Sequence, residues 1–101
     1  MHKCAYYRMR YVWDPEKARS NARKHGVHFA DAAFALEDDW ALTIEDESSD
    51  ERRWVTLGRD LFGRLLVVAY TYRYDEIRIF SARKASPQER RQYGKAHEEI
   101  L

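Results

Sequence analysis

The stretch WDPEKARSNARKHGVHF, residues 13–29, decides the first half of the fold. Asp14 belongs to the residue types that accept hydrogen bonds from the free N–H groups at a helix start, and Pro15 suits the first helical position because it has no N–H to leave unpaired. Gly26 ends the helix, since glycine readily takes the left-handed conformation that other residues avoid. The stretch therefore predicts a helix from Pro15 to about His25.

Regular elements are predicted on both sides of this helix. Aromatic and β-branched residues alternate with Arg8 and Arg10 from Tyr6 to Trp13, a pattern typical of a strand. Apolar residues then recur at helical spacing across residues 29–36, which indicates a second short helix.

The second half of the chain changes to the period of strands. Short polar or glycine-containing turns separate the candidates, as in hairpins, so an antiparallel meander is expected. The four predicted strands are Trp40–Glu45, Arg53–Leu57, Leu65–Tyr72 and Glu76–Ala82.

A last helix is predicted from Ser86 onward. Ser86 can cap it, Pro87 fits its first position, and Glu89 can complete a capping box. The resulting order, β-α-α-β-β-β-β-α, predicts an α+β fold with a mainly antiparallel sheet packed against helices.

Length and composition predict one domain over residues 1–101. The single Cys4 can form no internal disulfide, and the sequence has no pattern of a signal peptide or a membrane span. We therefore expect a cytoplasmic protein without membrane association. The net charge is only +1, but residues 31–51 hold nine acids and no Lys or Arg, while residues 52–91 hold ten basic residues and four acids. This layout predicts a separate basic face, unless the two segments interleave in space.

Arginines on the last two predicted strands are candidate ligands for an anion. A tight hairpin would place Arg73 near Arg78, while Arg83 would emerge at the opposite edge of the sheet. Each arginine can instead pair with an acid such as Asp75 or Glu76. The set as a whole favours a bound anion because few acids lie among the arginines.

The first helix offers two stripes of side chains. One carries Lys17, Asn21 and Lys24, and the other carries two alanines and His25. We expect the alanine stripe to face the sheet and Lys24 to reach solvent and phosphate. His25 fits either a hydrogen-bonded histidine at a helix end or a catalytic group, and its pairing with His28 lacks a third ligand, so no metal site is predicted.

A second stretch, EIRIFSARKASPQERRQY at residues 76–93, joins the first in a family pattern. Together with Glu51-Arg52 between them, the two stretches resemble the BrnT-type toxins, small ribonucleases of bacterial toxin–antitoxin pairs with a RelE-like fold. Two positions depart from the pattern: Phe80 replaces an aliphatic residue, and His28 stands where a small hydroxyl often caps the second helix. The chain also has a longer start than the family, and we expect residues 1–10 to be flexible. The matching positions are Trp13, Asp14, Pro15, Lys17, Asn21, Lys24, His25, Gly26, Val27, Phe29, Glu51, Arg52, Ile77, Arg78, Ile79, Ser81, Ala82, Arg83, Ala85, Glu89, Arg90 and Tyr93.

The resemblance implies a ribonuclease toxin that cleaves RNA and inhibits translation. It also implies a BrnA-type antitoxin with a ribbon-helix-helix DNA-binding part, so that the toxin would meet DNA only within that complex. We expect a metal-independent endoribonuclease without a cofactor. Such a reaction needs a base for the 2′-hydroxyl, cations for the extra charge on phosphorus, and an acid for the leaving oxygen.

Eight residues near the motif positions are candidates for this chemistry. We expect Arg83 to be functional, with little effect on stability, and Asp14 to be structural. His25, Glu51, Lys24 and Tyr93 are the candidates for acid and base, and their order is open. The catalytic candidates are Lys24, His25, Glu51, Arg73 and Arg83, and the RNA-binding candidates are Arg52, Arg78 and Tyr93.

A different class of function uses the same cations. A non-enzymatic module that binds nucleic acid or protein through the basic strands would need no general base. Ala substitution at His25, Glu51 and Arg83 distinguishes the two classes, because a binding module keeps its RNA affinity after substitution and never cuts RNA.

Overall fold

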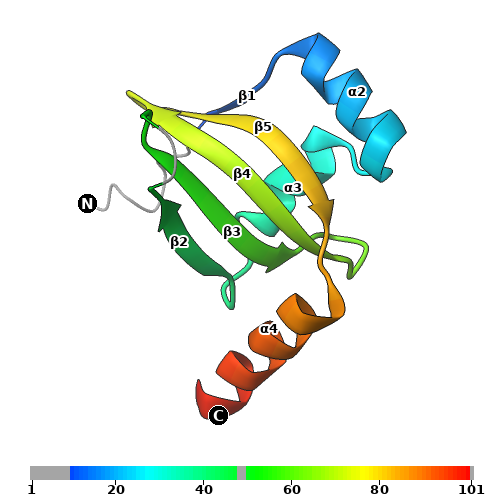
Figure 1. Ribbon diagram of the computed structural model, residues 1–101, viewed down its shortest axis with the longest axis vertical. Coiled ribbons are helices and arrows are strands. Elements are labelled where there is room, and N and C mark those ends of the chain that lie inside the picture. The colour runs from blue at the N-terminus through cyan, green and yellow to red at the C-terminus, as the bar shows by residue number, and fades with distance from the viewer. Residues whose placement is uncertain (1–9, 48–49, 101) are drawn as a thin grey trace, which may run out of the picture.

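The computed structural model of the chain describes residues 10–47 and 50–100, and Figure 1 shows their arrangement. The observed order of elements confirms the predicted β-α-α-β-β-β-β-α succession. Most boundaries lie within two residues of the predicted ones, and residues 6–9 of the predicted first strand lie outside the described part. The elements are β1 (Arg10–Val12), α2 (Pro15–His25), α3 (Phe29–Ala35), β2 (Leu42–Asp46), β3 (Arg53–Arg59), β4 (Leu65–Arg73), β5 (Glu76–Lys84) and α4 (Pro87–Ile100).

The five strands form one mixed sheet in the order β1-β5-β4-β3-β2. Strands β2 to β5 form the predicted antiparallel meander, and β1 pairs in parallel with the first residues of β5. Local patterning could not reveal this parallel pairing, because both helices and three strands separate its two partners in sequence.

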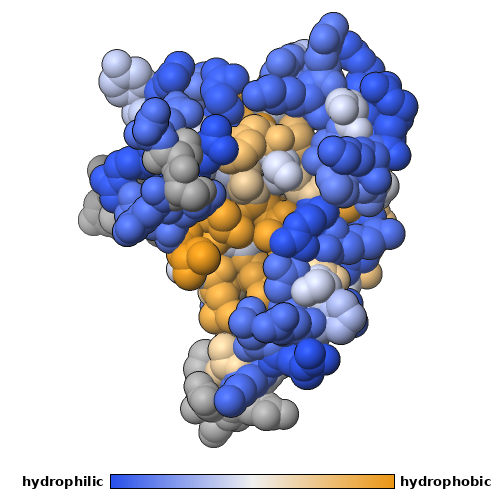
Figure 2. All heavy atoms as spheres, viewed as in Figure 1, coloured by the Kyte–Doolittle hydropathy of each residue, from blue (hydrophilic) through white to orange (hydrophobic). Residues whose placement is uncertain are grey.

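The two faces of the sheet carry different cores. Helix α3 covers one face, where Phe29, Leu66, Val68 and Ile79 belong to the main buried cluster, and α2 lies along the edge of β5 (Figure 1). A smaller cluster around Leu57, Leu65, Val67 and Tyr93 lies on the other face beside α4. We call this second face the open face, because α4 covers only part of it. Figure 2 shows apolar surface running down the middle of this face between hydrophilic flanks.

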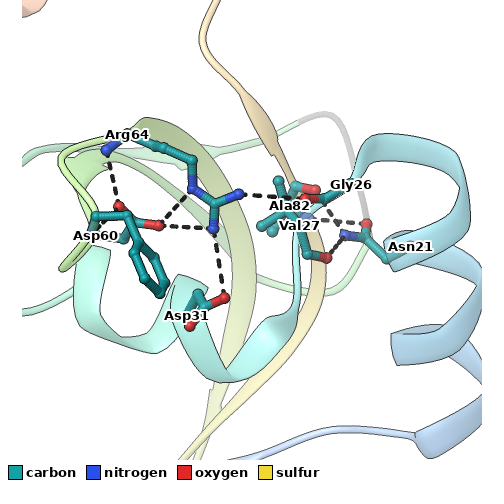
Figure 3. A network of polar contacts seen from close by, with 8 residues as sticks. Asn21, Gly26, Val27, Asp31, Asp60, Arg64 and Ala82 are labelled. Carbon is teal, nitrogen blue, oxygen red and sulfur yellow. Dashed lines mark hydrogen bonds and ion pairs between the residues drawn. The ribbon is translucent and has the colours of Figure 1, made fainter.

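Asn21 departs from the prediction for α2. It was expected on a solvent-facing stripe with the two lysines, but its side chain is only 8% exposed and is turned toward the sheet. Its amide donates to the carbonyl of Ala82 at 2.8 Å and accepts from the N–H of Ala82 at 3.1 Å. The amide also donates to the carbonyl of Val27, as Figure 3 shows. The edge of β5 beyond its contact with β1 would otherwise leave these backbone groups unpaired, and a side-chain amide satisfies both of them.

Gly58 brings α3 close to the sheet. A Cβ atom at this position would lie 2.2 Å from the backbone oxygen of Ala35, so only glycine permits this approach without displacement of the helix. The predicted caps of the helices are also present: Asp14 accepts from the N–H of Glu16, and Gly26 has a φ of 70°. His28 makes no side-chain cap at α3, in agreement with its departure from the family pattern.

The acidic and basic segments interleave, so the predicted separation of charge is incomplete. Acids from residues 31–51 interact with arginines from the second half, as in the pairs Asp31–Arg64 and Glu45–Arg52. Arg64 also pairs with buried Asp60 and donates to the carbonyl of Gly26 (Figure 3). It therefore joins the β3–β4 turn to the end of α2.

None of the helices in the described part of the chain has the length and apolar composition of a membrane span.

We predict that Asn21→Leu lowers the free energy of unfolding by about 2–4 kcal/mol, because it leaves buried backbone groups of Ala82 and Val27 without partners. Urea denaturation would measure the change. The control is Arg23→Ala, an exposed position on the same helix, with an expected effect within about 0.5 kcal/mol. An equally small effect of Asn21→Leu would show that water can replace the amide.

Candidate functional site

Three arginines lie on the open face at the end of the sheet away from α4. Arg53, Arg73 and Arg78 each adjoin a residue that faces the main core, and side chains alternate along a strand, so all three project from the opposite face. Thr71 pairs with Arg78 in the β4–β5 ladder, and Arg73 is two residues further along β4. The tight turn includes Tyr74 with a φ of 57°, and it brings Arg73 and Arg78 near each other as predicted.

Arg53 and Phe80 extend this group, and sequence reasoning missed both. The ladder pairs Tyr70 with Ile79 but Ala69 with Ser81, which leaves Phe80 as an extra residue without a partner on β4. The guanidinium carbon of Arg53 lies 4.7 Å from the centre of the Phe80 ring. The presence of Phe80 where the family has an aliphatic residue was the only sequence signal for this contact. The sequence could not show that the ring contacts Arg53, which lies 27 positions away.

A polar hollow lies between α2 and β5 on the other side of Phe80. Lys17, Ser20, Asn21, Lys24 and His25 line it from α2, while Phe80 and Ser81 line it from β5. Its volume is about 270 Å³, below the usual range for sites that enclose a drug-sized ligand. The hollow is suited to a phosphate or a single nucleotide unit, with Lys24 exposed at its rim and His25 half-buried.

Arg83 lies apart from this group and holds the start of α4. Its guanidinium donates to both carboxylate oxygens of Glu89, at 2.9 and 2.8 Å. Glu89 also accepts from the N–H of Ser86, which completes the predicted capping box. Arg83→Ala would therefore remove a tie between the sheet and α4, which revises the expectation that stability would barely change.

Tyr93 also joins α4 to the body of the protein. The residue is 5% exposed, and its hydroxyl donates to Asp38 at 2.6 Å. Burial and the hydrogen bond to Asp38 raise the pKa of Tyr93. In Asp38, burial favours a higher pKa, but the Tyr93 hydroxyl and the N–H groups of Trp40 and Arg59 outweigh it and lower the pKa. The ring of Tyr93 is thus packed within the smaller core rather than exposed to a nucleobase of RNA.

Arg52 and Glu51 lie at the start of β3, outside the group on the open face. Arg52 projects toward the helix-covered face, where it pairs with Glu45 at 2.8 Å and lies over Trp54. Glu51 is exposed. The structure therefore brings together Arg73 and Arg78 on one side of Phe80, and Lys24 and His25 on the other.

Metal ligands do not gather in this region. Within residues 10–47 and 50–100, no three His, Cys, Asp or Glu side chains are grouped so that they could hold a metal ion. The arrangement instead offers guanidinium and ammonium groups, which can neutralise phosphate oxygens directly.

Comparison with known proteins identifies the family. Residues 13–89 match the family described as "Ribonuclease toxin, BrnT, of type II toxin-antitoxin system". The chain belongs to the BrnT family. A comparison with curated protein sequences gives no match. The crystal structure of the Brucella abortus ribonuclease toxin BrnT is similar, with a TM-score of 0.60 and 26% identity over 78% of this chain and 99% of that one.

The BrnT match covers the hollow, strands β2 to β5 and the arginines on the open face. It ends at Glu89, within the first turn of α4. The chain is accordingly a ribonuclease toxin of the type II toxin–antitoxin class, with RNA as its substrate and an antitoxin as its partner.

We predict a pH-dependent contribution of Glu89 to stability. The hydrogen bonds from Arg83 lower the pKa of Glu89 from 4.5 to about 2 against the opposing effect of burial, and Ser86 adds to the lowering. A carboxyl with a lowered pKa in the folded state stabilises the fold above its ordinary pKa and loses this contribution as the pH falls. The stability difference between the wild type and Glu89→Gln should be constant above pH 4.5 and shrink toward pH 2.

Urea denaturation of both proteins across this pH range would measure the difference. The pH-dependent contributions of the other carboxyl groups are shared by both proteins and largely cancel in the difference. A difference that does not change with pH would contradict the assigned ion pair.

Proposed function

We propose that this BrnT-family toxin is a metal-independent endoribonuclease whose site surrounds Phe80. The observation that carries the proposal is the set of three arginines on the open face, beside a hollow that holds two lysines and a histidine. Cations placed around a phosphate can stabilise the charge that develops on phosphorus without a metal ion.

The roles follow from the chemistry of each side chain. Arg73 and Arg78 are exposed on adjacent strands and would bind the RNA backbone. Lys24 would neutralise the phosphate in the hollow. His25 is the candidate for proton transfer, because an imidazole can both accept and donate a proton. Glu51 is retained as the alternative base.

The contacts of the other sequence candidates favour structural roles over RNA binding. Arg83 and Tyr93 support α4, and Arg52 lies with Glu45 toward the opposite face. We therefore assign their effect on activity to the placement of α4 and β3 rather than to contact with RNA. The binding-module alternative is not favoured, because the family consists of ribonuclease toxins.

The antitoxin is proposed to be of the BrnA type, with a ribbon-helix-helix part that carries all DNA binding of the complex. An acidic or extended segment of this partner would neutralise the toxin most simply by covering the arginines of the open face, so that it competes with RNA. A ribonuclease that inhibits translation in this way would act in the cytoplasm.

We predict that the purified chain cleaves single-stranded RNA in the presence of EDTA and gives 2′,3′-cyclic or 3′-phosphate ends. Arg78→Ala should lower the rate about 10²-fold, the scale expected for the loss of one charge-stabilising group. Arg23→Ala on the exposed side of α2 is the control and should cut at the wild-type rate. Gel analysis of end-labelled RNA would measure both.

Equimolar antitoxin should stop the cleavage, and added RNA should relieve the inhibition. Complete loss of cleavage in EDTA with recovery in Mg²⁺ would refute the metal-independent mechanism. Inhibition that RNA cannot relieve would refute competition at the open face.

A further inference from the structure

We propose that Arg53, held on the ring of Phe80, is the phosphate-binding centre of the open face and takes a phosphodiester group of RNA between Arg73 and Arg78. The RNA part of this inference rests on the proposed function. The site differs from the sequence candidates, because neither Arg53 nor Phe80 belongs to them.

Arg53 is distinguished by its surroundings. Unlike Arg73 and Arg78, it is half-buried, and its Nε has no hydrogen-bond partner in the described part of the chain. None of the ion pairs found among the described residues involves Arg53, whereas Arg64 and Arg83 each pair with a carboxylate. Partial burial of a charge without a partner costs free energy, and a bound anion would recover that cost.

The stacking of Arg53 on Phe80 favours a phosphate over a nucleobase. The guanidinium carbon of Arg53 lies over the Phe80 ring, 4.7 Å from its centre. The N–H groups of a guanidinium point outward in its plane, and their fork matches two oxygens of a phosphate. Stacking also restricts the long side chain, so less entropy is lost when the anion binds.

The neighbouring positions make the site a cationic cradle rather than a single charge. Thr71 pairs with Arg78 across the β4–β5 ladder, and β3 runs beside β4 with Trp54 opposite Tyr70. The next residues along these two strands are Arg53 and Thr71, so three adjacent strands present Arg53, Thr71 and Arg78 in one row. Arg73 is two residues further along β4, on the same face. An anion above this row meets guanidinium groups from three strands.

Phe80 connects the cradle to the hollow on α2. The ring contacts Arg53 and also lines the hollow that contains Lys24 and His25. One strand of RNA could therefore place one phosphate on Arg53 and the adjacent nucleotide in the hollow.

Binding of a short single-stranded RNA at increasing salt concentrations would test the site. Arg53→Met should reduce the slope of log K against log salt by about 0.7, the value for one lost phosphate contact on a single strand. Arg53→Lys should keep most of that slope but lower cleavage, because an ammonium group cannot reproduce the stacked fork. Phe80→Leu should weaken binding while leaving the charge unchanged. Arg19→Met removes an arginine from the exposed surface of α2 and is the control for charge alone.

The alternative to a phosphate site is that Arg53 only balances the charge of a neighbouring carboxylate. Asp46 allows a test of this alternative, since it is opposite Arg53 in the β2–β3 ladder. If Arg53 only balanced this carboxylate, Asp46→Asn combined with Arg53→Met would restore wild-type RNA affinity, and that result would overturn the site. Continued loss of affinity in the double variant would support it.

Two further outcomes separate this inference from the proposed function. A wild-type protein that cuts RNA, with an unchanged salt slope in Arg53→Met, would overturn the phosphate site alone. A wild-type protein that binds RNA through Arg53 but never cuts it would support the site and overturn the proposed function.

Discussion

The pairing of the Asn21 amide with the backbone of Ala82 is the constraint on which the candidate site depends. Strand β1 covers the edge of β5 only from Glu76 to Arg78, and the amide of Asn21 takes the place of a neighbouring strand at Ala82. Because three hydrogen bonds fix this side chain, α2 has one position along β5. The same position brings Lys24 and His25 to Phe80 and Ser81, so a contact that completes a sheet edge also assembles the hollow.

The arginines fall into two groups, according to whether they pair with a carboxylate. Arg64 and Arg83 are held by carboxylates, and they join the β3–β4 turn to α2 and α4 to the sheet, respectively. Such ion pairs hold neighbouring elements together, but the carboxylate neutralises the charge that the arginine could offer to a ligand. Arg53, Arg73 and Arg78 take no part in the ion pairs found in the described residues, and they share one face with Phe80 between them and the hollow. The position of an arginine relative to the acids, rather than the number of arginines, therefore decides which guanidinium groups keep their charge available to a ligand.

The sequence predicted the elements well because their signals are local. The capping residues Asp14, Gly26 and Ser86 have the contacts or conformation that their types indicate. The site was predicted less well, because its geometry depends on pairings between distant residues. The contact of Arg83 with Glu89 was not predicted, and Asn21 was expected in solvent but meets Ala82. The contact of Arg53 with Phe80 depends on a shift in the β4–β5 register, which no periodicity in one strand can reveal.

The central claim is that cations around Phe80 promote attack by the 2′-hydroxyl of RNA on its neighbouring phosphate. Cleavage of a short RNA with a single 2′-deoxy substitution at the scissile nucleotide tests this claim most directly, with an all-ribose RNA of the same sequence as the reference. The account predicts that the substituted RNA binds with nearly the same affinity and is not cut at that position. Cleavage of the 2′-deoxy substrate at the original position and rate would contradict it, because water and not the 2′-hydroxyl would then be the nucleophile.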